Sequence, residues 1–591
     1  MTRGLFLGKL HSESTFPYPA RHAISKDKLE ELSLFVEPVR AFFTSVNDAA
    51  ANDENASIPP NVRKGLADLG AYGLQVPESY SGLGLSNTGY ARLVEEVGAA
   101  DLGIAVHLGA HQSIGFKGIL LFGTPAQKIK YLPALAAGAH IASFALTEPS
   151  MGSDTSACKT RAVLDADGKT WRLTGGKMWI SNGGQAEIFT VFAQTLLPDP
   201  KGVPGAMKDK LTAFIVERAF GGVTHGPPEK KMGIKCSNTA QVYFDATPVP
   251  AENVIGSVGG GFKVAMETLN NGRFGMGAAL TGAIKALLAG AATHAAARVQ
   301  FGGRKIQDYG AIQAKIAGIA VRCYGAESLA FALAANMDRG MVDYALEAAA
   351  LKVYASDAAW WAADETIQTL GGLGFMKTLP FERMTRDLRI FRIFEGTNDI
   401  LKLLIAGQGL QAVGELLKKE GIFGVGVRAF QARFLGRAPS APGALAWAPA
   451  SLSASAKAIE KATSAFGDAV VGLVIVHRQG LIEQQMVLTR VADVAIDLTV
   501  ASVALSRAAE SAKTGSAEAA AEADLANLAV LEAIVRIVDA MMQIKAHSDA
   551  AYKSSVTLPK PDWRRIEELR IKVSQAVCKK GGYTAGYPLG F

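Results

Sequence analysis

The chain has 591 residues, too many for one hydrophobic core, and its length suggests roughly three to four domains. Apolar residues make up 49% and charged residues 19%, which is typical of a folded, soluble protein and excludes a disordered one. The net charge of +7 fits anionic partners, such as a phosphate-bearing ligand or a membrane surface, or simply a mildly basic solvated surface. There is no dense basic stripe with interleaved aromatics, so we expect no nucleic-acid partner.

Targeting and metal-binding signals are not evident. No uninterrupted apolar run approaches the about 20 residues of a membrane span, and residues 1–20 resemble no export or organelle signal. The four cysteines lie far apart and predict reduced core thiols. This suits a bacterial cytoplasm, with or without peripheral attachment to the inner membrane, or the mitochondrial matrix and inner membrane for a mature eukaryotic chain. The nine histidines form no paired motif, so we expect no metal.

The first two expected regions differ in their hydrophobic period. Residues 27–140 show apolar side chains at helical spacing and predict an N-terminal α-helical domain. Residues 141–255 instead contain short β-rich runs separated by Gly, Pro, Asp and Asn, which predict a small middle β domain, either a sandwich or a barrel. The runs are Trp171–Thr174, Thr190–Gln194, Leu211–Glu217 and Gln241–Asp245.

Helical periodicity returns over residues 261–410, where Ala-rich segments predict a helical bundle. Residues 411–450 end in a Pro/Ala linker, 438–450. Residues 451–591 predict an extra α-helical domain of three long amphipathic helices and a shorter one. The expected fold class is therefore α+β and multidomain. The expected helices are 276–297, 309–338, 344–370, 451–478, 482–513, 517–547 and 563–578.

One carboxylate stands out in the segment Arg392–Asp399, where Glu395 lies between two bulky apolar residues and a glycine, just before an expected helix. Asn398 or Thr397 can cap that helix, and Asp399 suits its positive N-terminal end. We expect Glu395 to be partly desolvated, which would raise its pKa and make it a stronger base. An isolated motif of this kind is more often a surface glutamate in a helix-entry loop.

Further motifs carry groups suited to phosphates and aromatic rings. Residues 144–154 predict a strand end running into a polar Gly/Ser loop, whose N–H and hydroxyl groups can bind phosphate or ring heteroatoms. Residues 177–182 place a Trp two positions before a Ser, as an aromatic wall with a hydroxyl would, although core packing also explains the Trp. Residues 297–302 supply an Arg suited to phosphate, and the paired glycines of 368–374 allow close backbone approach.

Together with Asn270–Arg273, and in this order and spacing, these motifs resemble the acyl-CoA dehydrogenase family. The C-terminal extension and the segments 111–118 and 587–591 resemble its very-long-chain branch, so the resemblance covers nearly the whole chain. It implies a bound FAD. The residues implied at FAD are Phe144, Leu146, Thr147, Gly152, Ser153, Trp179, Ile180, Ser181, Arg298, Phe301, Gln368, Gly371, Gly372, Thr397 and Asp399.

The resemblance also assigns the acyl-CoA side of the site. It implies that Glu395 is the catalytic base, since Gly272 occupies the position that carries the base in a minority of subfamilies. Two positions depart from the family pattern: Met151 replaces a small residue of the flavin loop, and Thr378 replaces an acidic residue. The residues implied at the substrate are Ser153, Asn270, Arg273 and Gly396, with Gly115 and Gly118 along the acyl chain.

Gly115 and Gly118 lie three residues apart in an apolar helical run and so share one face. The missing side chains leave either a groove or room for close helix–helix packing. The resemblance favours an opened acyl tunnel.

The implied reaction is α,β-dehydrogenation of a long- or very-long-chain acyl-CoA to the trans-2-enoyl-CoA, the first step of β-oxidation. The implied assembly is a homodimer that passes electrons to an electron-transfer flavoprotein. Three alternatives are an acyl-CoA oxidase, a non-enzymatic assembly factor and a helical binding protein without cofactor. The physiological chain length, the electron acceptor and the host are left open by the sequence.

Residues 411–437 combine basic residues with apolar and aromatic ones, which suits an interfacial helix on anionic lipid. The glycines at 421, 424, 426 and 436 are expected to weaken any continuous helix. Packing of the same apolar face on the C-terminal bundle is the alternative.

Overall fold

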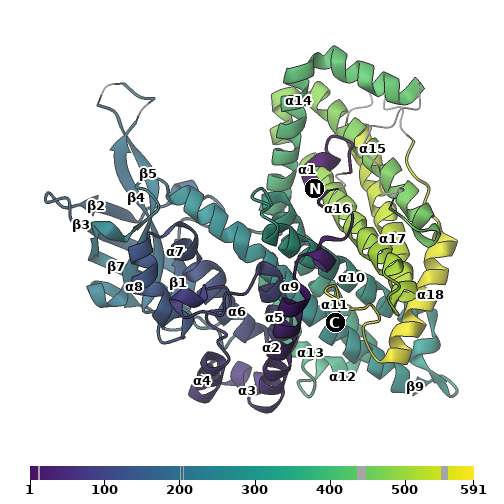
Figure 1. Ribbon diagram of the computed structural model, residues 1–591, viewed down its shortest axis with the longest axis horizontal. Coiled ribbons are helices and arrows are strands. Elements are labelled where there is room, and N and C mark those ends of the chain that lie inside the picture. The colour runs from purple at the N-terminus through teal and green to yellow at the C-terminus, as the bar shows by residue number, and fades with distance from the viewer. Residues whose placement is uncertain (11–12, 200, 204, 435–446, 548–556, 591) are drawn as a thin grey trace. The chain divides into compact units, whose positions relative to one another are not determined.

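The computed structural model describes residues 1–10, 13–199, 201–203, 205–434, 447–547 and 557–590, without side chains for 420–434 (Figure 1). Its internal contacts divide the chain into two compact units. The helical unit comprises Met1–Ser33, Leu280–Thr385 and Phe391–Phe591, and the sheet unit comprises Leu34–Ala279 and Arg386–Ile390.

The sheet unit begins with short helices that have well-formed starts. Asp101 accepts hydrogen bonds from the Gly103 and Ile104 N–H groups at the start of α6. Thr124 and Gln127 form a reciprocal capping box ahead of α8. These helices are α3 (Ala49–Glu54), α4 (Pro60–Asp68), α5 (Asn87–Ala100), α6 (Leu102–Leu108), a π-helix (Gly109–Gly115), α7 (Lys117–Phe122) and α8 (Pro125–Ala136).

The middle region forms an eight-stranded sheet in the order β6-β7-β3-β2-β4-β5-β8, with β1 parallel to β4. All four predicted β-runs lie within its strands. Within the described residues the strand path has two ends, at β6 and β8, so the sheet is open and the barrel alternative is wrong. The strands are β1 (Ala142–Ala145), β2 (Arg161–Leu164), β3 (Thr170–Ser181), β4 (Ile188–Pro198), β5 (Met207–Glu217), β6 (Val223–His225), β7 (Thr239–Pro250) and β8 (Val254–Ile255).

The sheet is covered by apolar side chains on both faces, and β4 contributes to both layers. Ile188 and Phe192 belong to the cluster that also contains Phe116 and Leu132 of the helical layer. Phe189 and Val191 belong to a second cluster with Trp171 and Phe214. Alternation along one strand therefore fills two cores, as expected where a sheet has no solvent face.

The helical unit contains helices from the 261–410 region and the C-terminal helices in one compact body. Helix α16 packs against α10, α14 and α17, and α18 packs on α10 and α17 (Figure 1). Its helices are α1 (Thr2–Leu5), α10 (Gly310–Asp338), α11 (Ala345–Leu370), α12 (Gly372–Phe375), α14 (Asn398–Phe434), α15 (Ser453–His477), α16 (Gln485–Lys513), α17 (Ala519–Ala546) and α18 (Trp563–Lys580). The pair β9 (Val299–Gln300) and β10 (Arg304–Lys305) completes it. Helices α2 (Lys26–Ser45), α9 (Gly261–Ala297) and α13 (Phe381–Leu388) cross the boundary between the units.

Helix α14 corrects the expectation of a helix broken by glycines after residue 411. It is continuous from Asn398 to Phe434, and its first part packs against α11 and α16. Each helical glycine costs only about 1 kcal/mol relative to alanine, which tertiary packing can offset. Residues 435–446, and with them most of the predicted linker 438–450, lie outside the described residues, as do the side chains of 420–434 on which the lipid-contact hypothesis depends.

Within the described residues, three helices are long and apolar enough to cross a membrane by length and composition: α9, α10 and the Asn398–Lys419 part of α14. The expectation from the sequence concerned uninterrupted apolar runs, whereas these helices reach the threshold by mean hydropathy, as Ala- and Gly-rich segments that include polar residues. The apolar windows of α9 and α10 are 78% and 94% buried inside the protein, against 28% in α14. The first two therefore serve as core helices.

Candidate active site

Glu395 lies in a tight turn between α13 and α14, and its side chain is half-buried. Its backbone has a φ of +55°, and Gly396 follows with a φ of +93°. A left-handed φ costs a non-glycine residue about 1–2 kcal/mol, so the surrounding structure must impose it. The Phe394 ring packs edge-on against Phe391 with ring centroids 5.0 Å apart. The turn therefore fixes one carboxylate beside an aromatic pair.

At the start of α14, only one of the two candidate residues caps the helix. Thr397 is the cap, because its Oγ1 accepts a hydrogen bond from the Ile400 N–H at 3.2 Å. Asn398 is buried and turns its amide toward α11 instead. Asp399 is exposed on the first turn, where a carboxylate suits the helix dipole.

In the sheet unit the two expected flavin motifs lie side by side. The Met178 N–H donates to the Thr147 carbonyl at 2.9 Å, and the Ser143 hydroxyl donates to the Ser181 carbonyl at 2.9 Å. The register of β3 against β7 shifts between Lys177 and Ile180, which is a bulge. The structure thus joins the 144–154 loop to the 177–182 strand, two segments that the sequence could only propose separately.

The bulge presents Trp179 outward. Trp179 has a φ of +57° and its side chain is 62% exposed, while Ile180 is buried in the sheet core. A large ring held outward at a strained backbone position is typical of a ligand surface rather than of core packing. This favours the aromatic wall over the core alternative. With the nearby Thr147 and Ser181 groups, the surface fits a planar heteroaromatic ligand such as the isoalloxazine of FAD.

The remaining loop residues divide between core and surface. Met151 is 1% exposed and belongs to the apolar cluster, and its backbone exchanges hydrogen bonds with Glu148. The unusual methionine therefore points into the protein. Phe144 packs on Phe192 and Leu146 is buried, whereas Gly152 and Ser153 are exposed. A Cβ at Gly152 would meet no atom within 4 Å.

A buried ion pair that sequence reasoning missed supports this loop. Lys177 Nζ lies 2.7 Å from Glu148 Oε1 and donates to the Leu146 carbonyl at 3.1 Å, and both side chains are almost fully buried. Burial acts to raise the pKa of Glu148, but Lys177 and hydrogen bonds from Thr160 and Lys159 lower it to about 2. The pair spans 29 positions, so no local pattern could reveal it.

Five further residues implied at FAD lie in the helical unit and are exposed: Arg298, Phe301, Gln368, Gly371 and Gly372. Phe301 is 82% exposed and has a φ of +45° at the β9–β10 turn. A Cβ at Gly371 or Gly372 would meet no atom within 4 Å, so this backbone is open to a ligand.

The expected substrate residues on α9 and near the π-helix differ in their packing. Arg273 is 5% exposed and its Nη1 donates to Asn270 Oδ1 at 2.6 Å. A Cβ at Gly115 would lie 2.5 Å from the Ala110 carbonyl oxygen, so this glycine allows close packing rather than a groove. A Cβ at Gly118 would meet Val264 at 3.4 Å, an ordinary contact.

All four cysteines are buried, and none of them forms a disulfide. The described residues contain no group of three or more His, Cys, Asp and Glu side chains that could hold a metal ion.

Comparison with known proteins decides the family. Family models described as the N-terminal, middle and C-terminal domains of acyl-CoA dehydrogenase match residues 29–139, 143–247 and 259–410. A model described as the ACAD9/ACADV C-terminal domain matches residues 450–583. The mitochondrial very long-chain specific acyl-CoA dehydrogenase of Bos taurus is 48% identical over 601 residues, covering 100% of this chain and 88% of its own length. The chain belongs to the acyl-CoA dehydrogenase family.

Other relatives agree with this assignment. The human very long-chain specific acyl-CoA dehydrogenase of mitochondria is 47% identical, with 100% of this chain and 88% of its own covered. A crystal structure of an acyl-CoA dehydrogenase complexed with FAD, from Bacillus anthracis, has a TM-score of 0.81 at 28% identity and covers 98% of this chain and 99% of its own. Acyl-CoA dehydrogenases are flavin-dependent oxidoreductases, and FAD is the cofactor of this one.

Proposed function

We propose that this acyl-CoA dehydrogenase converts long- and very-long-chain acyl-CoA to the trans-2-enoyl-CoA, with Glu395 as the base. The observation that carries the assignment of Glu395 is its geometry: a half-buried carboxylate on a turn held in the left-handed region. The full-length identity to very long-chain specific relatives supports the substrate class.

In the proposed reaction Glu395 removes the proton α to the thioester, and the hydrogen on the β-carbon leaves as hydride. Bound FAD would supply the redox chemistry, as the acceptor for that hydride. The Glu395 N–H lies on the same turn and is the proposed hydrogen-bond donor to the thioester oxygen, where negative charge develops as the α-proton leaves. Asn270, Arg273, Ser153 and Gly396 are proposed to contact the acyl-CoA.

The test is Glu395→Gln, which keeps size and polarity but removes the basic carboxylate. Its flavin should bleach with acyl-CoA, under anaerobic conditions, at least about a thousandfold more slowly than in the parent, while FAD content and acyl-CoA binding stay unchanged. Glu415→Gln, an exposed position on α14, is the matched control. Bleaching of Glu395→Gln within tenfold of the parent rate would remove Glu395 from the mechanism.

The partners of this reaction are also part of the proposal. We expect a homodimer in which Arg298 of one subunit approaches the cofactor of the other. An electron-transfer flavoprotein is the proposed acceptor, and fast reoxidation by oxygen in its absence would favour the oxidase alternative. Four free buried thiols fit a reducing compartment, either a bacterial cytoplasm or a mitochondrial matrix. Acyl-CoA chains of increasing length, tested by anaerobic bleaching, would define the substrate range.

A further inference from the structure

The turn that carries Glu395 is held from one helix on both sides of the glutamate. After Glu395, the Lys352 ammonium on α11 donates to the Gly396 carbonyl at 2.8 Å and to Asn398 Oδ1 at 2.9 Å. Before it, Arg392 Nε lies 2.7 Å from the carboxylate of Asp357, also on α11.

The amide of Asn398 joins these two contacts. Its Nδ2 donates to Ser356 Oγ at 2.9 Å and to Asp357 Oδ1 at 3.1 Å. Lys352, Ser356 and Asp357 lie within about one and a half turns of α11, so a single rigid helix grips the turn at several points. We call Lys352, Ser356, Asp357 and Asn398 the α11 clamp.

Lys352 is the costly member of the clamp. Its side chain is 0% exposed, and an ammonium removed from water costs several kcal/mol that a packed apolar residue would not. Stability alone therefore does not explain a lysine here. What it supplies is a long arm with several donors, ending at the peptide next to Glu395.

We propose that Lys352 is a positioning residue for the base: through Gly396 and Asn398 it imposes the strained backbone that aims the Glu395 carboxylate. This rests on the proposed role of Glu395. Proton transfer needs the base within hydrogen-bond reach of the substrate carbon, and a misplacement of about 1 Å can cost about a hundredfold in rate.

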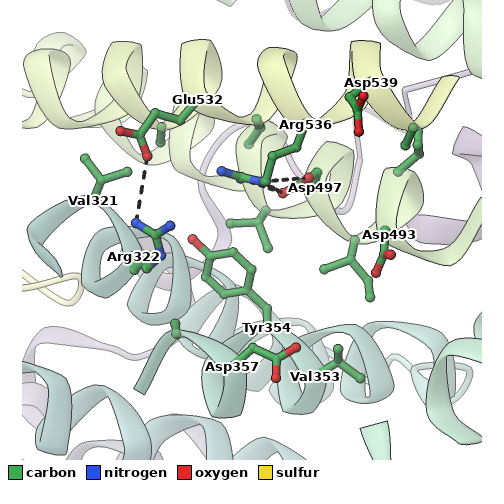
Figure 2. A pocket seen from close by; sticks show the side chains of 18 of the residues that line it. Val321, Arg322, Val353, Tyr354, Asp357, Asp493, Asp497, Glu532, Arg536 and Asp539 are labelled. Carbon is green, nitrogen blue, oxygen red and sulfur yellow. Dashed lines mark hydrogen bonds and ion pairs between the residues drawn. The ribbon is translucent and has the colours of Figure 1, made fainter. Parts of the chain in front are cut away.

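Asp357, at one end of the clamp, lines a cavity. Val353, Tyr354 and Asp357 of α11 form one wall of a cavity of about 510 Å³, and Figure 2 shows Asp357 on this wall opposite Asp493. Asp493 of α16 in turn lies 2.8 Å from Lys402 of α14. Because the cavity leaves room around Asp357, its carboxylate can be changed with little repacking. Lys402 lies on α14, the helix that follows the turn. Among the described interactions, its side chain makes no contact with the clamp.

The main variant is Lys352→Met, which keeps the length of the side chain and removes its donors. Single-turnover anaerobic bleaching at saturating acyl-CoA should slow roughly 10- to 100-fold. FAD content, and the dissociation constant obtained from the concentration dependence of bleaching, should change less than about threefold, because no clamp residue is among those assigned to FAD or acyl-CoA. Lys402→Met, which removes a lysine that ion-pairs with Asp493 instead of contacting the turn, should bleach at the parent rate.

Two further variants make the result decisive. Asp357→Asn keeps the shape of the clamp and removes the negative charge that faces Arg392 Nε and that accepts from Asn398 Nδ2, so it should slow bleaching several-fold. It decides the question if Lys352→Met yields no folded holoenzyme. If Lys352 acts through Glu395, the double variant Lys352→Met/Glu395→Gln should be no slower than Glu395→Gln alone.

The outcomes separate this inference from the function on which it rests. Parent-like bleaching in folded Lys352→Met or, failing that, in folded Asp357→Asn overturns the clamp while leaving Glu395 as the base. Multiplying losses in the double variant also overturn it, since Lys352 would then act independently of Glu395. Fast bleaching by Glu395→Gln overturns the proposed base itself, whatever the clamp variants do.

Discussion

Arg507 is the largest fully buried side chain of the helical unit, and its removal should destabilise that unit strongly. Its guanidinium lies 2.6 Å from Glu327 of α10 and 3.3 Å from Glu522 of α17, and it donates to the Gly586 carbonyl at 2.6 Å. Both carboxylates have side chains that are 0% exposed. Arg507→Met would leave them buried with one cation fewer. Breaking a buried pair in this way costs about 3–5 kcal/mol.

The pH dependence of this loss has a definite sign. Burial alone would raise the pKa of Glu327, but Arg507, helped by Lys285, holds it below its ordinary value. A carboxyl with a lowered folded-state pKa contributes stability above its unfolded pKa and loses it as pH falls through the folded value. The stability difference between parent and Arg507→Met should therefore be greatest near neutral pH and shrink in acid.

Urea unfolding followed by tryptophan fluorescence measures this prediction, because Trp360, Trp361, Trp447 and Trp563 all lie in the helical unit. The control is Arg564→Met, whose side chain is 91% exposed beside Glu568 and which should cost less than about 0.5 kcal/mol. A loss below about 1 kcal/mol for Arg507→Met at neutral pH, or a loss that grows in acid, would refute the reasoning.

Three further predictions concern assembly, the acyl chain and a buried lysine. Arg298→Ala should lower FAD content and dimer stability together, as measured by flavin absorbance and sedimentation; full occupancy in an intact dimer would make Arg298 a plain surface charge. Gly118→Ala should slow turnover of very-long-chain acyl-CoA more than turnover of medium-chain acyl-CoA. Gly115→Ala, whose Cβ would collide with the Ala110 carbonyl, should lower stability and all activities alike. Equal losses across chain lengths for Gly118→Ala would indicate a packing defect. Burial lowers the pKa of Lys117 from 10.5 to about 7. Between these two pH values the unfolded chain binds one more proton than the folded protein, so the free energy of unfolding rises with pH. Lys117→Met should lose that rise, and an unchanged pH profile of unfolding would contradict the prediction.

The sequence predicted what depends on period and order. The helices at 309–338, 344–370, 451–478 and 563–578 are confirmed within a few residues by α10, α11, α15 and α18, since long apolar periodicity is a strong local signal. Thr397, the observed cap of α14, was one of the two predicted candidates, because a hydroxyl residue just before an apolar helical run is also a local signal.

What the sequence could not predict depends on contacts between distant segments. The open edges of the sheet follow from strand order, which no single strand encodes. The continuity of α14 through residues 421, 424 and 426 shows that the modest propensity cost of a glycine does not by itself end a helix. Gly115 was expected to open a groove, but it lies in a π-helical turn pressed against Ala142 of β1, a contact that helical spacing does not foresee.

Two buried lysines that the sequence analysis did not identify make similar contacts, and these contacts differ from those of Arg507. Lys177 reaches the Leu146 carbonyl in the flavin loop, and Lys352 reaches the Gly396 carbonyl beside Glu395. Each extends from a regular element to a backbone carbonyl in a loop or turn. Arg507 of α16 instead contacts α10, α17 and the Gly586 carbonyl near the end of the chain. Loss of Lys352, which holds the turn at Glu395, should misplace that carboxylate within a folded protein. Loss of Arg507, which connects helices, should destabilise the unit that contains it. Loss of Lys177 should do both, because it displaces the flavin loop and also leaves the Glu148 carboxylate buried without this cation. Rate and stability are therefore expected to respond to different buried cations of the same chain.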